Sequence, residues 1–241
     1  MNIHVEPSMW LLLLKLSALS GLLMLDAAMV GQWMLAYPIF AAPLIGFLFG
    51  QPYAGFIIGI LFQLFWSNKL PVGVSSPPET PLLAIVAIVC YVLSSHLGAM
   101  SLYSPWILPL LLISLSGGVL GGYLTVWIRT FNNHLAAWAD KQADALNVTA
   151  LNVMPLGALI MGWVLYGGLV FLLGGVFLLL RTYVSLDVLS LHYTRLYVWI
   201  LAALGFAAIV ELFEVTKRYR WLFFGLGAGL IVGLLARWLR G

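Results

Sequence analysis

The sequence contains little charge. Of its 241 residues, 8% are Asp, Glu, Lys or Arg, compared with about 25% in soluble domains, whereas 63% are hydrophobic and the mean hydropathy is +1.06. This composition excludes a soluble globular protein and indicates an integral membrane protein. The net charge of +3 is spread over the boundaries of the apolar segments. That distribution is typical of juxtamembrane Lys and Arg, and it predicts no nucleic-acid partner.

Catalytic and cofactor motifs are also lacking. The single cysteine, Cys90, allows neither a disulfide framework nor a cysteine metal site. The sequence has no GxxxxGK[ST] nucleotide-binding loop, no HExxH pair, and no Ser-His-Asp constellation among its four histidines and eight acids. A membrane-embedded enzyme is therefore disfavoured, no cofactor or metal is expected, and the energy for any transport must come from another protein.

Apolar segments fill most of the chain. They predict an all-α fold class, a polytopic membrane protein with about seven to nine hydrophobic segments that include broken or re-entrant helices. Residues 1–241 are expected to form a single integral membrane domain, because no stretch could build a separate soluble one. The clearest apolar segments are 8–30, 35–50, 54–66, 82–102, 106–128, 151–180, 196–212 and a last one that ends near 238.

Residues 50–81 combine a short apolar helix with a polar hairpin. The run 54–66 would extend only about 20 Å as a helix, whereas a hydrocarbon core of about 30 Å needs roughly 20 residues. Residues 67–81 then contain four prolines, one glycine and two opposite charges, which must end the helix. Many transporters build substrate sites from such broken helices, because irregular backbone at membrane depth must line protein or a wet cavity. The alternative is an ordinary aqueous loop.

Residues 129–150 form the other polar stretch. Phe131, Leu135, Trp138 and Leu146 recur there at helical spacing. This pattern predicts an amphipathic segment that lies at the membrane interface against lipid or a partner subunit, and not a span.

Two blocks of residues resemble a known family, the IIC membrane subunit of the mannose-fructose-sorbose type sugar phosphotransferase system. The first runs from Pro38-Ile39 and Ala42-Pro43-Leu44-Ile45-Gly46 through Gly50, Gly55 and Gly59 to Pro71-Val72-Gly73 and Pro77-Pro78-Glu79. The second contains Ile128-Arg129-Thr130, Ala139-Asp140-Lys141, Ala143-Asp144 and Asn147-Val148-Thr149-Ala150. Together they cover most of residues 25–150, and the Leu25-Asp26 start and the LPVG loop resemble the deltaproteobacterial branch.

The resemblance implies a permease domain in the bacterial inner membrane. In that family IIC and IID subunits together form the sugar channel, and soluble IIA and IIB domains relay phosphate from phosphoenolpyruvate through histidines. The resemblance therefore implies a hexose-type substrate, a IID partner, an oligomer of IIC–IID pairs, and phosphoryl transfer carried by the partners. It also implies a core domain and a smaller domain that move relative to each other.

Two departures from the family keep a second function open. The family usually has an acid where this chain has Gln63 and an Asp where it has Gln51. Glutamine can donate and accept hydrogen bonds but cannot act as a charged acceptor. A diverged scaffold or sugar sensor that does not transport is the alternative function.

The candidate sugar-binding residues lie in or beside the hairpin. Glu79 is the main one, because a carboxylate at an apolar boundary must be paired, hydrated or used; Lys69 could pair with it. Gln63 could face the sugar or form a helix–helix hydrogen bond, and Trp66 could stack on a sugar ring because it borders the loop. The full candidate set is Glu79, Gln63, Asn68, Gln51, Lys69, Gly73 and Trp66.

Other residues have two interpretations each. Asp26 could line the pathway or pair with a cation at a helix end. His96 could accept a phosphoryl group, although a buried or interfacial histidine is favoured. The pairs Gly55/Gly59 and Gly117/Gly121 stand four residues apart, which predicts helix faces that allow close packing.

Overall fold

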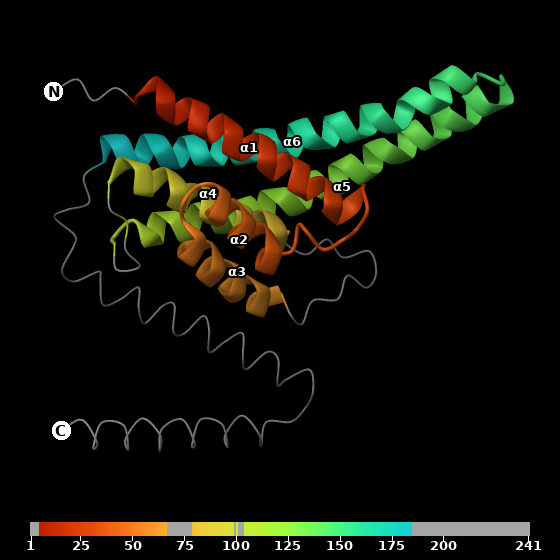
Figure 1. Cartoon of the computed structure of the whole chain (residues 1–241). Coiled ribbons are helices and arrows are strands. Elements are labelled where there is room, and N and C mark those ends of the chain that lie inside the picture. Colours follow the sequence, from red (N-terminus) through yellow and green to blue (C-terminus); the bar gives the residue numbers. More distant parts are fainter. Residues whose placement is uncertain (1–4, 67–78, 99, 101–103, 185–241) are drawn as a thin grey trace, which may run out of the picture.

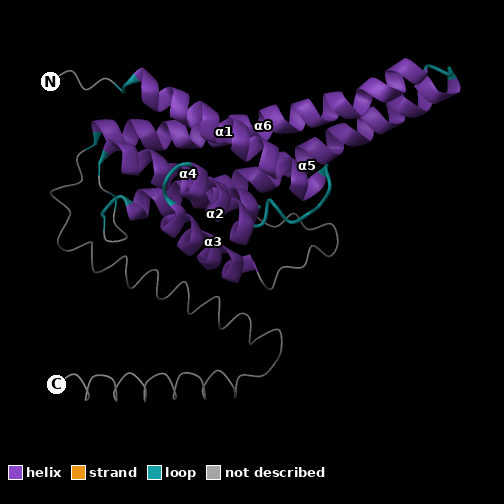
Figure 2. Ribbon diagram, in the orientation of Figure 1, coloured by secondary structure: helices purple, strands orange, loops and turns teal. Residues whose placement is uncertain are grey.

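The computed structural model describes residues 5–66, 79–98, 100 and 104–184. Within these ranges every regular element is a helix, and four of the helices are long and apolar enough to cross a membrane (Figure 2). This confirms the predicted all-α membrane class; the segments expected over 196–212 and near 238 lie outside the described residues. The helices are α1 Pro7–Ala28, α2 Pro38–Leu48, α3 Pro52–Trp66, α4 Thr80–Leu97, α5 Ile107–Asp144 and α6 Val148–Tyr183.

Prolines mark the starts of four helices. Pro7, Pro38 and Pro81 occupy the first or second helical position, and Pro52 opens α3. Proline suits these positions because its fixed φ is already helical and its missing N–H would have no partner there. The breaks between apolar runs in the sequence therefore become the helix boundaries.

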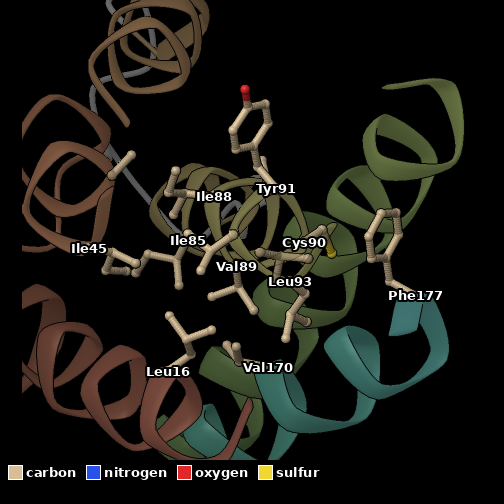
Figure 3. Packing of buried hydrophobic residues seen from close by; sticks show 14 of the residues in the cluster. Leu16, Ile45, Ile85, Ile88, Val89, Cys90, Tyr91, Leu93, Val170 and Phe177 are labelled. Atoms are coloured by element: carbon tan, nitrogen blue, oxygen red, sulfur yellow. The ribbon is translucent and has the colours of Figure 1, made fainter. Parts of the chain in front are cut away.

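Helix α4 forms the centre of the bundle. Fourteen of its residues, from Thr80 to Ser94, are buried, and it contacts all five other helices. Such a helix is apolar on every face because every face meets protein. Figure 3 shows side chains of α4 surrounded by those of the neighbouring helices, among them Leu16 of α1, Ile45 of α2 and Val170 of α6.

Helices α2 and α3 form a tight antiparallel pair, in which neither helix is long enough to span a bilayer. A Cβ added at Gly55 would lie 2.5 Å from the Ala42 carbonyl oxygen, and one at Gly59 would lie 2.7 Å from that of Pro38. The predicted close approach on the Gly55/Gly59 face is thus confirmed. The face is used within the chain, against α2.

Helices α5 and α6 are much longer than the rest. Their far ends project beyond the other helices as a hairpin arm, the part formed by residues 129–158 (Figure 1). With 38 residues, α5 is roughly 57 Å long, nearly twice a hydrocarbon core.

The arm contains the polar stretch 129–150. We expected a separate interfacial segment there, but residues 129–144 continue α5 without a break. No Gly or Pro interrupts this part of the sequence, so nothing ends the helix before the turn at Leu146, where φ is +53°. Asn147 then caps α6 by accepting a hydrogen bond from the Ala150 N–H at 3.2 Å, and it donates one to Gln142 Oε1 at 3.0 Å. The position of this segment relative to the bilayer stays a prediction.

Candidate functional site

Three of the seven candidate residues have described side chains. These are Glu79, Gln63 and Gln51, whereas Asn68, Lys69 and Gly73 lie outside the described residues, as does the expected Lys69–Glu79 pair. The backbone of Trp66 ends α3. The described part of the site therefore consists of Glu79, just before α4, and the residues that surround it.

The two glutamines lie far apart. Gln51 sits in the α2–α3 turn, where its N–H donates to the Gly46 carbonyl at 2.6 Å and its carbonyl accepts from the Gly55 N–H at 3.0 Å. Gln63 lies twelve residues further along α3, which corresponds to roughly 18 Å of helix. Its Oε1 accepts a long hydrogen bond, 3.4 Å, from the Ile39 N–H at the start of α2. The side-chain carbonyl oxygen of Gln63 therefore forms a helix–helix hydrogen bond, which is one of the two interpretations given above.

Glu79 occupies a different environment, directly before α4. Its backbone N–H donates to the Gly118 carbonyl of α5 at 2.8 Å, and a Cβ placed on Gly121 would lie 3.2 Å from the Glu79 Cβ. The absence of side chains at these two glycines lets the start of α4 contact the backbone of α5. The half-buried Glu79 carboxylate is thereby brought to the next turn of α5.

A polar cluster lies at that turn. Burial raises the pKa of the Glu79 carboxyl, and the neighbouring Thr125 hydroxyl lowers it. Thr125 Oγ1 lies 2.9 Å from the Tyr166 hydroxyl of α6. Thr125 and Tyr166 are 3% and 1% exposed, so both hydroxyls depend on protein partners. Arg129 is exposed one turn beyond Thr125, and its charge attracts the Glu79 carboxylate.

The sequence contains a partial signal for this cluster. Gly117, Gly121, Thr125 and Arg129 recur every four residues, so they share one face of α5. We interpreted the glycines as a packing surface and did not extend the row to Thr125 and Arg129. Tyr166 has no comparable signal, because its pairing with Thr125 joins residues 41 positions apart.

The cluster lies near one end of the membrane spans. Residues 107–128 of α5 would cover roughly 33 Å, about the thickness of a hydrocarbon core, so Arg129 falls at its boundary. Glu79 directly precedes the span Thr80–Leu97, so it begins at the same level. A carboxylate and two hydroxyls here can form hydrogen bonds with a polyhydroxylated molecule that enters from the adjacent water.

The side chains of Asp26 and His96 form hydrogen bonds with backbone groups. The Asp26 carboxylate accepts from the Trp33 N–H at 2.8 Å and the Ala36 N–H at 3.3 Å. The expected pairing with a cation is therefore replaced by a clamp on the loop between α1 and α2. His96 Nδ1 lies 2.9 Å from the Val92 carbonyl oxygen, which agrees with a histidine that stabilises the end of α4.

Two grooves elsewhere have apolar walls. One lies between α1 and α6 and has a volume of about 420 Å³; the other lies in the hairpin arm and has about 380 Å³. Side chains such as Leu14 and Phe171 line the first, and Phe131 and Met154 line the second. Such walls suit hydrocarbon, whereas a sugar needs convergent polar groups.

Comparisons with known proteins agree with one another. The family model described as the sorbose-specific IIC component of the PTS system matches residues 9–236. The fructose permease IIC component of Bacillus subtilis (strain 168) is 23% identical over 150 residues, which cover 62% of this chain and 51% of that protein. The match thus spans about half the length of this relative.

Two solved structures share the fold. One, described as a membrane protein, is 17% identical, with a TM-score of 0.64, and the match covers 95% of this chain and 88% of that one. The other is the mannose transporter ManYZ in complex with microcin E492, which is 18% identical, with a TM-score of 0.56 and the same coverage. At these identities the likeness concerns the fold.

Proposed function

Because the chain belongs to the family of sorbose-specific IIC components of the PTS system, we propose that it is a sugar permease subunit that binds a hexose-type sugar and passes it across the membrane. It is a multi-pass inner-membrane protein of the mannose-type group. In this proposal residues 1–241 act as one permease domain. Phosphoryl transfer to the sugar takes place on a IIB partner that IIA supplies.

The observation that carries the proposal is the polar cluster of Glu79, Thr125 and Tyr166. Carboxylates in membrane segments are costly and are retained where they bind or relay something. An ionised carboxylate offers two oxygens as acceptors, and hydrogen bonds to a charged acceptor are about twice as strong as neutral ones. We assign Glu79 as the main acceptor for sugar hydroxyls, with Asn68, Lys69, Gly73 and Trp66 approaching the sugar from the hairpin.

The two glutamines contribute less in this proposal. The carbonyl oxygen of Gln63 is occupied by Ile39, which leaves its NH₂ group for a sugar. Gln51 lies at the opposite end of α3. Transport then requires that the hairpin moves with its domain and exposes the sugar to the phosphorylating partner.

The test measures sugar uptake with and without the partners. Inverted vesicles that contain this chain with a IID subunit, supplied with soluble IIA and IIB, the soluble phosphocarrier proteins that phosphorylate IIA, and phosphoenolpyruvate, should phosphorylate one of D-fructose, D-mannose or L-sorbose. Vesicles with this chain alone should show no concentrative uptake, because the sequence has no nucleotide-binding loop. Concentrative uptake by the chain alone would overturn the proposal.

A second function, a sugar sensor or scaffold that does not transport, is supported by the use of Gln63 in helix packing. A transporter of this family usually carries an acid at that position. The same vesicles separate the two functions, because a sensor would bind the hexose with full affinity and still fail to deliver it to IIB.

The hairpin arm gives a test of membrane placement. We propose that residues 129–150 lie outside the hydrocarbon, since α5 exceeds the membrane thickness by nearly half its length. Cysteines introduced at Asn133 and Gln142 should react with a membrane-impermeant thiol reagent from one and the same side. The native Cys90 is buried and contributes little background. Labelling from opposite sides would mean that the segment crosses the membrane.

A further inference from the structure

Three helices each contribute one polar group to the cluster. Glu79 comes from the start of α4, Thr125 from the glycine face of α5 and Tyr166 from the middle of α6. Tyr166 is 1% exposed and therefore cannot contact a sugar itself. Any effect of Tyr166 on binding must pass through Thr125.

The number of hydroxyl hydrogens determines the order of donors and acceptors among Tyr166, Thr125 and Glu79. An ionised carboxylate only accepts hydrogen bonds, so a bond between Thr125 and Glu79 would use the single hydroxyl hydrogen of Thr125. The Thr125 oxygen is then free to accept, and the Tyr166 hydroxyl is its donor at 2.9 Å. The order is Tyr166 to Thr125 to Glu79, and every hydrogen has an acceptor.

The reverse order leaves a buried donor without a partner. If Glu79 were protonated and donated to Thr125, Thr125 would donate to Tyr166, and the Tyr166 hydrogen would need a further acceptor. The described residues provide none. An unpaired buried donor is costly, which favours the charged form of Glu79. Burial of this carboxyl raises its pKa, whereas the Thr125 hydroxyl and the exposed Arg129 lower it.

We propose that Thr125 and Tyr166 are positioning residues, which hold one oxygen of the Glu79 carboxylate through a directed hydrogen-bond chain and leave the other oxygen for a sugar hydroxyl. This inference rests on the proposed function, because it requires that Glu79 binds the sugar. It adds that the α6 helix takes part in sugar binding without touching the sugar. Hydrogen bonds in such a chain polarise one another, so the loss of the distal hydroxyl weakens the bond to the carboxylate.

The test is a set of double-mutant cycles on hexose affinity. The complete membrane complex is purified with each variant, and its dissociation constant for radiolabelled D-fructose, D-mannose or L-sorbose is measured by equilibrium binding. Thr125→Val and Tyr166→Phe should each weaken binding about 2- to 12-fold, the range for one neutral hydrogen bond. Thr125→Ser keeps the hydroxyl and should restore nearly normal affinity. In a Glu79→Gln background neither substitution should change the affinity more than about 2-fold.

The control is Thr130→Val on the same helix. This change removes an exposed hydroxyl whose hydrogen bond, among the described residues, is to the Val126 carbonyl. Unchanged affinity in Glu79→Gln would overturn the sugar site itself. A weakened Glu79→Gln with unaffected Thr125→Val and Tyr166→Phe would overturn the positioning role alone. Losses of the same size in the Glu79→Gln background would also overturn it, because they would reveal a general packing effect. If Thr125→Val fails to assemble, Tyr166→Phe and Thr125→Ser still decide the question.

Discussion

Asp26 of α1 and Gln63 of α3 bond to backbone, whereas the polar side chains of the α4–α6 cluster face one another. Asp26 and Gln63 accept hydrogen bonds from main-chain N–H groups at the start of, or just before, a helix. Glu79, Thr125 and Tyr166 form a side-chain cluster to which three helices contribute. A side chain that satisfies orphan backbone donors is fully explained by the fold. A carboxylate held by a second side chain, with acceptor capacity to spare, requires a further partner.

Glycines contribute to both regions in different ways. In the α2–α3 pair they bring two backbones together, so that Gly55 meets the carbonyl of Ala42. In α5 they bring a functional group to its partner, because Gly118 and Gly121 let Glu79 reach the level of Thr125. Mutations should therefore affect stability in the first region and sugar affinity in the second.

The largest expected effect concerns Glu79→Gln. This change keeps the shape and removes the charged acceptor, so sugar affinity should fall by about 1.5–3 kcal/mol, which is roughly 10- to 150-fold. Glu6→Gln makes the same change at an exposed carboxylate before α1, so it is the matched control and should leave affinity unchanged. Equilibrium binding on the purified complex measures both. Equal losses of sugar affinity in the two variants would show that Glu79 has no special role in sugar binding.

The next effect concerns packing in α2–α3. Gly55→Ala places a Cβ 2.5 Å from the Ala42 carbonyl oxygen and 3.0 Å from Pro43 Cα, and backbone atoms cannot easily move aside. We expect a loss of about 1–3 kcal/mol of unfolding free energy, seen as a lower thermal midpoint in detergent. Gly168→Ala is the control, since a Cβ there meets nothing within 4 Å and a helical alanine is favoured. A stable Gly55→Ala variant would show that the pair can separate freely.

A smaller effect is expected at Asp26. The loop that it clamps holds Gln32 and Met34 at φ values of +52° and +68°, which are unfavourable for residues with a side chain. Asp26→Asn keeps one acceptor but turns an NH₂ group toward a backbone N–H, so stability should fall by about 1 kcal/mol. Sugar affinity should not change. Glu6→Gln removes an exposed carboxylate from the opposite end of the same helix and should have no effect on the thermal midpoint. A loss of affinity in Asp26→Asn would instead place Asp26 on the sugar pathway.

The smallest effect is expected at Gln63. Its hydrogen bond to Ile39 is long, so Gln63→Leu should lower stability by about 0.5 kcal/mol, at the bottom of the range for a neutral hydrogen bond. Chemical denaturation in detergent can resolve such a change when it is compared with Gln63→Glu. Sugar affinity should stay within about 2-fold of the wild type. A larger drop would show that the NH₂ group of Gln63 binds the sugar.

The helices of this chain were largely predictable from the sequence. Proline-marked boundaries and apolar runs locate all six described helices, and the spacing of Gly55 and Gly59 predicts the close packing of α3. The continuation of α5 to Asp144 was not predicted, because hydropathy ends at the membrane surface whereas helix propensity does not. Residues 130–144 contain four alanines, which favour helix, and neither Gly nor Pro.

The site was predictable only in part. Glu79 stands out in the sequence because an acid at an apolar boundary is unusual. Its partners do not, because threonine and tyrosine are ordinary in membrane helices and the Thr125–Tyr166 pair depends on how α5 and α6 pack. The role of Asp26 in the loop before α2 was not predictable either, because its partners are main-chain N–H groups, which no pattern of side chains reveals.

The most direct measurement is a cryo-EM structure of the complex with a bound hexose. The account predicts a sugar hydroxyl about 3 Å from one Glu79 carboxylate oxygen, with Thr125 still bonded to the other and Tyr166 still bonded to Thr125. A sugar bound along α2 and α3, with Glu79 contacting only Thr125, would contradict it.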